Sequence, residues 1–443
     1  MALNRQIARL AKILVDSEGI GFDEAQARLE SLTLEVVVGD DAVSPAAHAA
    51  VLTTVSVGRR TFVGGVRVRG ALNQTLNTAL PLLAETLGEA AVEVGASEFE
   101  GAPARRIYIG TSDADDRSWS VAARWDGWRA GVTEVGGATS GTGDNPLAGI
   151  AAGALAVGAA FQTERGRDVQ VKSELNLWPA ERSGEEAPAF AEVFLPGALW
   201  LIGLGNLGQA FLWALSALPY ADPTTVSLVL QDHDKVTEEN WATSVLVRDE
   251  TYGLLKTKVV ERWAEAKGFD VRRIDRRLVA GDRTDIDDPR LALSGVDKIA
   301  VRKLMGAVGF DCIVDAGLGR TAADFDRYRV SVFDQTRPID QHFATVQDEP
   351  VKVEILDQEA YRHLEAEIGS CGTAEVAGAS VAAPYVSAIA ASVAVSRLIA
   401  VTSGCACPAS EVGRVSSIEA RRTAPHTSTQ ARGIRHAGRP IVT

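Results

Sequence analysis

The residues with the clearest chemical potential form the run Leu199-Trp200-Leu201-Ile202-Gly203-Leu204-Gly205-Asn206-Leu207-Gly208. A hydrophobic strand here leads into a glycine turn, and helical character follows over 209–218. Glycine permits a tight turn, close approach of the backbone to a phosphate, and close packing of helix on sheet. Free N–H groups at the helix N-terminus can then bind the phosphate. The motif predicts a nucleotide-binding loop whose contact residues are Gly203, Gly205, Asn206, Leu207 and Gly208.

An acidic residue follows at the spacing that such a loop requires. Asp232 ends a second predicted strand, 226–231, and lies 24 residues after Gly208. Its carboxylate can accept hydrogen bonds from ribose hydroxyls, and the alternative is that it caps a loop. The neighbouring His233 is interpreted as an exposed loop histidine rather than a metal ligand. Loop and acid together predict a nucleotide ligand, and either ATP or NAD would satisfy them.

The residues after this acid distinguish the two ligands. The stretch from Asp232 to Trp241 resembles the D-x-D-x-V-x-x-x-N pattern of the ThiF and ubiquitin-activating superfamily. The G-x-x-K step of that family is similar to Gly253-Leu254-Leu255-Lys256, and its C-x-T-A segment to Cys371-Gly372-Thr373-Ala374. With the glycine loop, four motifs stand in the family order, and the resemblance spans about 200 residues, 198–400.

This resemblance implies a reaction and a set of ligands. Family members use ATP and Mg²⁺ to adenylate the C-terminal glycine of a ubiquitin-like or sulfur-carrier protein, and many then form a thioester on a cysteine. Asp234 and Asn240 would complete the nucleotide site, Lys256 would contact the phosphates, and Asp315 would hold Mg²⁺. Cys371 is the candidate thioester residue, because that step needs a polar, partly exposed thiol. A small loop residue is an equally good explanation of Cys371, and Lys258 competes with Lys256.

Two positions depart from the family pattern. Where the family has an arginine that reaches the triphosphate, this chain has Thr243, and Arg248 is the candidate substitute. Where the family has the second acid of a D-x-x-D step, this chain has Leu318, and Asp324 is the candidate replacement. Each lost charge would raise the catalytic barrier by a few kcal/mol, on the order of 10²-fold in rate.

The composition excludes several classes of function. A formal charge of −13 argues against general nucleic-acid binding, which needs an excess of Lys and Arg. The four cysteines include no C-x-x-C pair, so neither a structural zinc site nor a disulfide framework is expected. No signal peptide is recognised, and the longest apolar run, 146–161, is shorter than the roughly 20 residues of a membrane span. We therefore expect a cytoplasmic protein with neither nucleic-acid nor membrane partners.

Strands alternate with helices after residue 198, which predicts an α/β, Rossmann-like and mostly parallel sheet. We expect three parts: a degenerate, inactive adenylation-like α/β domain (1–190), an ATP-binding ThiF-like domain (191–407) and a basic flexible tail (408–443). The first part has no G-x-G-x-x-G after a strand, and a helix is expected over 79–87. Asn145-Pro146 and Ala383-Pro384 each lead into an Ala-rich helix. Either two related halves or two unrelated helices would produce that similarity.

The assembly expected by resemblance is a homodimer that takes its carrier protein from elsewhere, with a conjugating enzyme as a further partner. The family also borrows an arginine across a domain or dimer interface, for which Arg5, Arg59 and Arg60 are candidates. Two other functions remain open. One is a degenerate nucleotide-binding scaffold, and the other is an NAD-dependent oxidoreductase.

Overall fold

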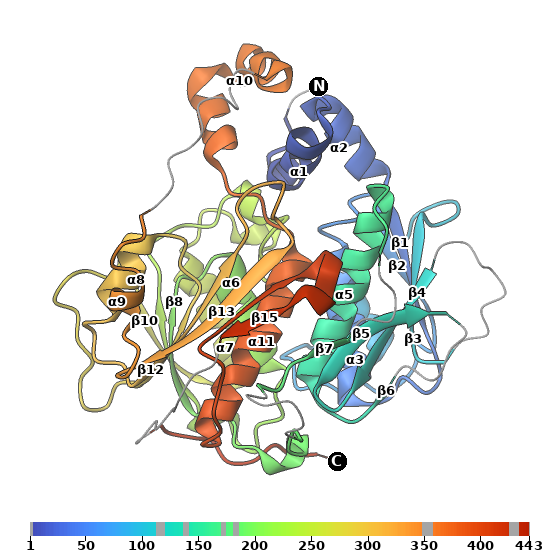
Figure 1. The fold of residues 1–443 in the computed structure, drawn as a ribbon. Helices are drawn as coiled ribbons and strands as arrows, with labels where there is room; N and C mark the ends of the chain where they lie inside the picture. Colours follow the sequence, from blue (N-terminus) through green and yellow to red (C-terminus); the bar gives the residue numbers. More distant parts are fainter. Residues whose placement is uncertain are drawn as a thin grey trace.

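A computed structural model shows a mixed α/β protein built on two sheets, which confirms the expected fold class (Figure 1). The structure describes residues 3–111, 120–135, 141–169, 174–179, 186–347, 358–424 and 434–442. One sheet belongs to the first half of the chain and the other to the second half.

The first half forms a sheet with the strand order β2-β1-β3-β4-β5-β7. The pairings among β2, β1, β3 and β4 are parallel, whereas β5 and β7 are antiparallel to their neighbours. The elements are η1 (Arg5–Ile7), α1 (Ala8–Glu18), α2 (Phe22–Ser31), β1 (Thr33–Val38), α3 (Pro45–Gly58), β2 (Gly65–Gly70), α4 (Leu87–Glu93), β3 (Arg105–Ile109), β4 (Ser120–Asp126), β5 (Arg129–Glu134), β6 (Gly141–Thr142), α5 (Pro146–Glu164) and β7 (Glu174–Asn176).

The second half forms a sheet with the order β10-β9-β8-β11-β12-β13-β14-β15. The strands from β10 to β12 are parallel, and those from β13 onward are antiparallel. The elements are β8 (Ala198–Ile202), α6 (Asn206–Ser216), β9 (Ser227–Gln231), α7 (Lys256–Lys267), β10 (Asp270–Ile274), β11 (Leu291–Ser294), α8 (Ile299–Met305), β12 (Cys312–Leu318), β13 (Arg327–Asp334), α9 (Ile339–His342), α10 (Glu359–Gly378), α11 (Pro384–Thr402), β14 (Ser410–Arg414) and β15 (Arg422–Ala424).

The two halves share one topology. The order β2-β1-β3-β4-β5-β7 corresponds strand for strand to β9-β8-β11-β12-β13-β14, with the change to antiparallel pairing at the same place. A helix follows the equivalent first strands, α3 after β1 and α6 after β8. The helices α5 and α11 precede the equivalent strands β7 and β14. This equivalence favours two related halves over a coincidence of Ala-rich helices.

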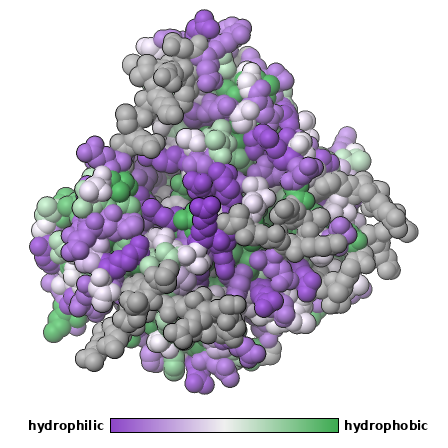
Figure 2. Space-filling model, in the orientation of Figure 1, coloured by the Kyte–Doolittle hydropathy of each residue, from purple (hydrophilic) through white to green (hydrophobic). Residues whose placement is uncertain are grey.

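The Ala-rich helices α5 and α11 lie at the centre of the molecule, each on its own sheet and against the other (Figure 1). By length and composition both could cross a membrane, but 94% of the most apolar window of each is buried. A side chain at Gly158 of α5 would meet the Tyr385 ring of α11 at 3.1 Å, so glycine allows this close approach. On the face seen in Figure 2, hydrophobic side chains are scattered among hydrophilic ones. Burial between the sheets thus explains the hydrophobicity of both helices.

The segment that follows Pro408 corrects the expectation of a flexible tail. Its first part forms β14 and β15, which extend the second sheet beyond β13. Two of its arginines have carboxylate partners: Arg414 lies 2.9 Å from Asp326, and Arg421 lies 3.3 Å from Glu411. The charged residues of β14 therefore have ion-pair partners in the folded protein, which the basic, polar composition of the segment does not reveal.

Lys267, the last residue of α7, links the two halves. Its Nζ donates to the carbonyl oxygen of Ala79 at 2.6 Å and to that of Leu218 at 3.3 Å. Burial lowers the pKa of Lys267 to about 8. Because the pKa is higher in the unfolded chain, the unfolded state binds more protons between about pH 8 and pH 10.5. The free-energy cost of burying this lysine is therefore at its full value below about pH 8. This cost declines as the pH rises toward about 10.5.

A comparison of wild type with Lys267→Met isolates this effect from the other groups that titrate at high pH. Between pH 7.5 and pH 10, we expect the free energy of unfolding of wild type to rise by about 2 kcal/mol relative to that of the variant. Urea denaturation at the two pH values measures this change. An unchanged difference would show that the lysine keeps its ordinary pKa in the folded state.

Candidate functional site

The glycine loop lies where the sequence predicts it, between β8 and α6. Gly203 has φ +82°, and a side chain there would meet the backbone of Gly295 and Val296 at 3.1 Å. A side chain at Gly208 would lie 2.2 Å from the carbonyl oxygen of Gly203. Both positions therefore require glycine, one for its conformation and one for the close packing of the first helical turn on the strand end.

The N-terminus of α6 is open and fits a phosphate group. Its N-cap residue is Gly205, and no side chain caps the first turn. The side-chain N and O of Asn206 are both buried without a hydrogen-bond partner. Leu207 is buried in the core, so it can offer only its backbone. In the first half, by contrast, the hydroxyl of Ser44 caps the equivalent helix α3 by accepting from the Ala47 N–H at 3.1 Å. Of these two equivalent helices, α6 is the one that leaves its first-turn N–H groups for a ligand.

Asp232 connects this loop to the acidic segment that follows β9. One carboxylate oxygen accepts from the Leu204 N–H at 2.6 Å, and the other accepts from the N–H groups of His233 and Asp234 at 2.7 and 2.9 Å. Asp232 thus caps the loop, as the alternative interpretation holds. It also retains free lone pairs beside the glycine loop that a ribose hydroxyl could use.

Asp234, Asn240 and Lys256 meet at one cavity. Lys256, the first residue of α7, donates from Nζ to Asp234 at 2.8 Å, and its backbone N–H donates to the Asp234 carbonyl at 2.9 Å. Burial raises the pKa of Asp234, but the hydrogen bond and charge of Lys256, aided by His233, outweigh it and leave the pKa below its ordinary value. Asn240 accepts from the Thr237 N–H at 3.0 Å through Oδ1. The ion pair places a cation at the cavity wall.

The cavity has a volume of about 420 Å³ and lies between the N-terminal segment, the 234–240 loop and α10. Figure 1 shows α10 beside α1 and α2 at one end of the molecule. Neither the glycine-loop residues nor Asp232, Arg248 or Asp315 line the cavity. The residues that do are Leu3, Arg5, Ala8, Arg9, Lys12, Asp234, Lys235, Thr237, Glu239, Asn240, Lys256, Ile368, Gly372, Glu375, Val376 and Ala379.

Arg9, on α1, is a site residue that the sequence interpretation missed. Its Nε is buried without a hydrogen-bond partner. Burial lowers the pKa of Arg9, and the charges of Glu239, Asp297 and Glu375 oppose the shift. The sequence does contain a pattern that could have identified Arg9. Arg5, Arg9 and Lys12 follow at i, i+4 and i+7, which places three cations on one helical stripe. All three line the cavity.

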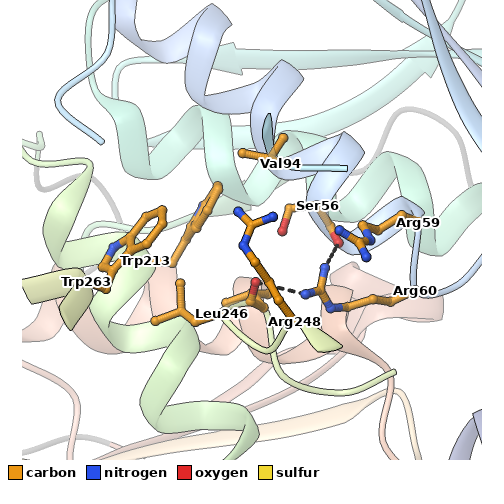
Figure 3. Close-up of a pocket in the computed structure, with 9 residues that line it drawn as sticks. Ser56, Arg59, Arg60, Val94, Trp213, Leu246, Arg248 and Trp263 are labelled. Atoms are coloured by element: carbon orange, nitrogen blue, oxygen red, sulfur yellow. Dashed lines mark hydrogen bonds between the residues drawn. The ribbon is translucent and has the colours of Figure 1, made fainter. Parts of the chain in front are cut away.

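The other candidate arginines fall into two groups. Arg5 lines the cavity with a side chain 67% exposed, 3.9 Å from Glu239. Arg59, Arg60 and Arg248 instead surround a separate pocket between the halves (Figure 3). Arg248 donates from Nη1 to the Glu93 carbonyl at 2.8 Å, so the structure does not bring it to the cavity that Asp234, Asn240 and Lys256 line. Its neighbour Thr251 caps the turn that directs the arginine toward the first half.

Asp315 is not arranged as a Mg²⁺ ligand. It is fully buried, lies 3.0 Å from Arg302 and 3.3 Å from Arg329, and accepts from the Ser294 hydroxyl at 2.8 Å. Two guanidinium groups already neutralise its charge, so a divalent cation could bind only by displacing them. This corrects the expectation that Asp315 holds the metal.

The positions that depart from the family pattern are occupied by structural side chains. Thr243 is buried and donates to the Asn240 carbonyl at 3.3 Å. Leu318 ends β12 opposite Tyr328. Asp324 accepts from both the N–H and the hydroxyl of Thr321, at 2.9 and 2.7 Å, which closes its own loop. Asp324 therefore does not replace the missing acid.

The cysteines differ in their surroundings, and Cys407 lies close enough to Cys312 for its charge to act on that thiol. Cys312 lies in β12, 1% exposed, and burial raises the pKa of its thiol well above the ordinary value, as expected of a core residue. Position 371 lies in α10, two residues after Gly369, whose φ of +75° kinks the helix. The Cys371 side chain is outside the part of the chain that the structure describes, so its thioester role stays a prediction.

Comparisons with family models and with a relative point to the same protein family. The BilD C-terminal domain matches residues 195–405, and the BilD N-terminal domain matches residues 33–174. A relative named bacterial E1-like protein BilD, from Collimonas sp. (strain OK412), is 34% identical over 412 residues, which cover 88% of this chain and 87% of the relative.

Solved structures of E. coli MccB also resemble the chain. The complex with ATP is 13% identical, covers 55% of this chain and 67% of that one, and has a TM-score of 0.34. The complex with MccA-N7isoASN is 14% identical, covers 55% and 68% of the two chains, and has a TM-score of 0.36.

Proposed function

Because this chain belongs to the BilD family of E1-like proteins, we propose that it adenylates the C-terminal glycine of a ubiquitin-like or sulfur-carrier protein with ATP. The observation that carries this proposal is the open N-terminus of α6 with the unpartnered amide of Asn206. Asp232 connects that phosphate cradle to the loop whose residues Asp234 and Asn240 line a cavity with Lys256 and Arg9.

The reaction requires charge stabilisation more than acid–base chemistry. A carboxylate oxygen of the carrier protein attacks the α-phosphorus of ATP, the bond to the bridging oxygen breaks, and pyrophosphate leaves. Lys256 and Arg9 offset the charge of the triphosphate, and the α6 amides hold a phosphate. Because Arg9 comes from the first half of the chain, a single chain supplies this cation to its own site.

Mg²⁺ is expected to enter with ATP rather than to occupy a protein cage. The surroundings of Asp315 do not fit the ion, whereas Asp234 offers a carboxylate at the cavity. Mg²⁺ commonly uses one or two protein carboxylates together with substrate phosphates and water.

We assign Cys371 to the second step. Its thiolate would attack the acyl carbonyl of the adenylate, which forms a thioester and releases AMP. This assignment is supported by Ile368, Gly372 and Glu375 of the same helix, which line the cavity. The thioester would then pass to a conjugating enzyme.

Replacement of Cys371 with serine should abolish the thiol-sensitive adduct. Serine can form only an oxygen ester, which resists reducing agents. Gel electrophoresis with and without reductant, in the presence of ATP and the carrier protein, detects the difference. A Cys312→Ser variant serves as a control, because that thiol is buried. A reductant-labile adduct that persists in Cys371→Ser would move the step to another cysteine.

The nucleotide assignment is tested first by calorimetry of ATP·Mg²⁺ and of NAD with wild type and Asp232→Ala. We expect ATP to bind wild type and to bind the variant at least about tenfold more weakly, because the acid organises the loop and the ribose contact. NAD binding with no response to ATP would overturn the proposal in favour of an oxidoreductase.

A second candidate, a nucleotide-binding scaffold without catalysis, is favoured by the buried Asp315 and by Thr243 in place of the family arginine. ATP–pyrophosphate exchange with the cognate carrier protein separates the two functions. Exchange above background supports the enzyme, whereas ATP binding without exchange supports the scaffold.

A further inference from the structure

A small pocket at the contact between the two halves is separate from the nucleotide cavity (Figure 3). Arg59 and Arg60, at the end of α3, reach it from the first half, and Arg248 reaches it from the second half. The other lining residues are Ser56, Val94, Trp213, Val245, Leu246 and Trp263.

The three arginines lack close carboxylate partners, although Asp249 and Glu250 lie near enough for their charges to act on Arg59. No described carboxylate forms an ion pair with any of them. Arg60 uses its donors on four carbonyl oxygens, those of Ser56, Trp241, Val245 and Val247, at 2.7 to 3.0 Å. Arg248 has one such partner, the Glu93 carbonyl. Arg59 stacks over the Trp241 ring at 5.2 Å and makes no hydrogen bond with a described residue.

Repulsion among the three positive charges also lowers the pKa of Arg59 and Arg60. Burial lowers the pKa of Arg59, and the nearby charge of Arg248 lowers it further, against weaker opposition from Asp249 and Glu250. Burial and the charge of Arg59 lower the pKa of Arg60 as well. Arginine does not lose its proton at accessible pH, so the positive charge must be balanced in another way.

The size and chemistry of the pocket define the ligand. Its free volume is about 10 Å³, which is roughly the space for one water-sized sphere. Among the described residues, the wall presents guanidinium donors and the apolar faces of Trp213 and Trp263 but no carboxylate. Space for about one water-sized ligand favours a small anion over a larger polyatomic one. We infer that this pocket is a binding site for a monatomic anion, such as chloride, between the first and second halves.

Such an anion would connect the halves next to the 234–240 loop. Arg60 donates a hydrogen bond to the carbonyl of Trp241. The preceding residue, Asn240, lines the nucleotide cavity. Neutralisation of the arginines would stabilise this contact, and the benefit would follow the anion concentration by mass action.

The test is thermal unfolding of the full chain in sodium chloride or sodium bromide, with sodium gluconate used to hold the ionic strength constant. We expect a saturable rise of the melting temperature of about 2 °C or more with either halide, and no such rise in Arg59→Gln. Arg129→Gln is the matched control, because Arg129 is 62% exposed and 3.6 Å from Glu174. That variant should keep the response.

A second measurement does not depend on the folding of the variants. Crystals of the wild-type protein grown with bromide should show an anomalous peak between Arg59 and Arg248. Equal melting temperatures in halide and gluconate, an undiminished response in Arg59→Gln, or the lack of a bromide peak would each overturn the inference.

Discussion

Lys256→Ala is expected to lower kcat/KM for ATP–pyrophosphate exchange by about 100-fold or more. The Lys256 side chain is only 12% exposed, and its ammonium group lies at the wall of the nucleotide cavity, 2.8 Å from Asp234. A cation in such a partly dehydrated place offsets triphosphate charge more strongly than one in water. Its removal would also leave the carboxylate of Asp234 without the Lys256 ion pair. That carboxylate would then repel the phosphates of the nucleotide. Steady-state exchange assays with saturating carrier protein measure the loss.

Lys258 provides a control two residues further along α7. It pairs with Glu261 on the same helix and does not line the cavity. Lys258→Ala should therefore retain exchange within about twofold of wild type, since this partly buried pair lies away from the cavity. Similar losses in the two variants would contradict the assignment of Lys256 to the phosphates.

The largest effect on stability is expected from Arg60→Met, which should lower the free energy of unfolding by about 3–5 kcal/mol. The side chain is 1% exposed and holds four carbonyl oxygens, three of them in the segment 241–247. Methionine fills a similar volume but donates no hydrogen bond, so these buried acceptors would lose their partner. Urea denaturation followed by circular dichroism measures the change.

Arg69→Met is the appropriate comparison. Arg69 is 54% exposed and lies 3.3 Å from Glu98 on the surface of the first half. The substitution should change the free energy of unfolding by no more than about 0.5 kcal/mol. A loss below 1 kcal/mol in Arg60→Met, roughly the value of one ordinary hydrogen bond, would show that water replaces the guanidinium at the contact between the halves.

The parts of the fold that follow from local patterns could be predicted from the sequence. The glycine loop and its acid stand at the ends of adjacent parallel strands, and Asn145-Pro146 begins α5 through the Asn145 cap. The helix expected over 79–87 was wrong, because Thr86 and Glu89 form a capping box that starts α4 at Leu87. β14 was missed because its charged residues find partners only in the folded protein, which no local pattern reveals.

The same distinction applies to the site. Asp234, Asn240 and Lys256 share the cavity because their spacing is set by one strand end and one helix start. Arg9 enters it from more than 200 residues away, and only the packing of the two halves places it there. Asp315 matched a motif, but its partners, Arg302 and Arg329, come from α8 and β13, and they change a metal ligand into a buried ion pair.

The N-termini of α3 and α6 differ in what completes them. This difference makes the stability of the fold depend on the concentration of a ligand in the cell. The start of α3 is complete once the chain has folded, because Ser44 is part of the same polypeptide. The start of α6 is completed only by a ligand that arrives from solution. If that ligand is ATP, its concentration enters the folding equilibrium directly. It would do so through the second half at the start of α6 and through Arg9 of the first half at the cavity.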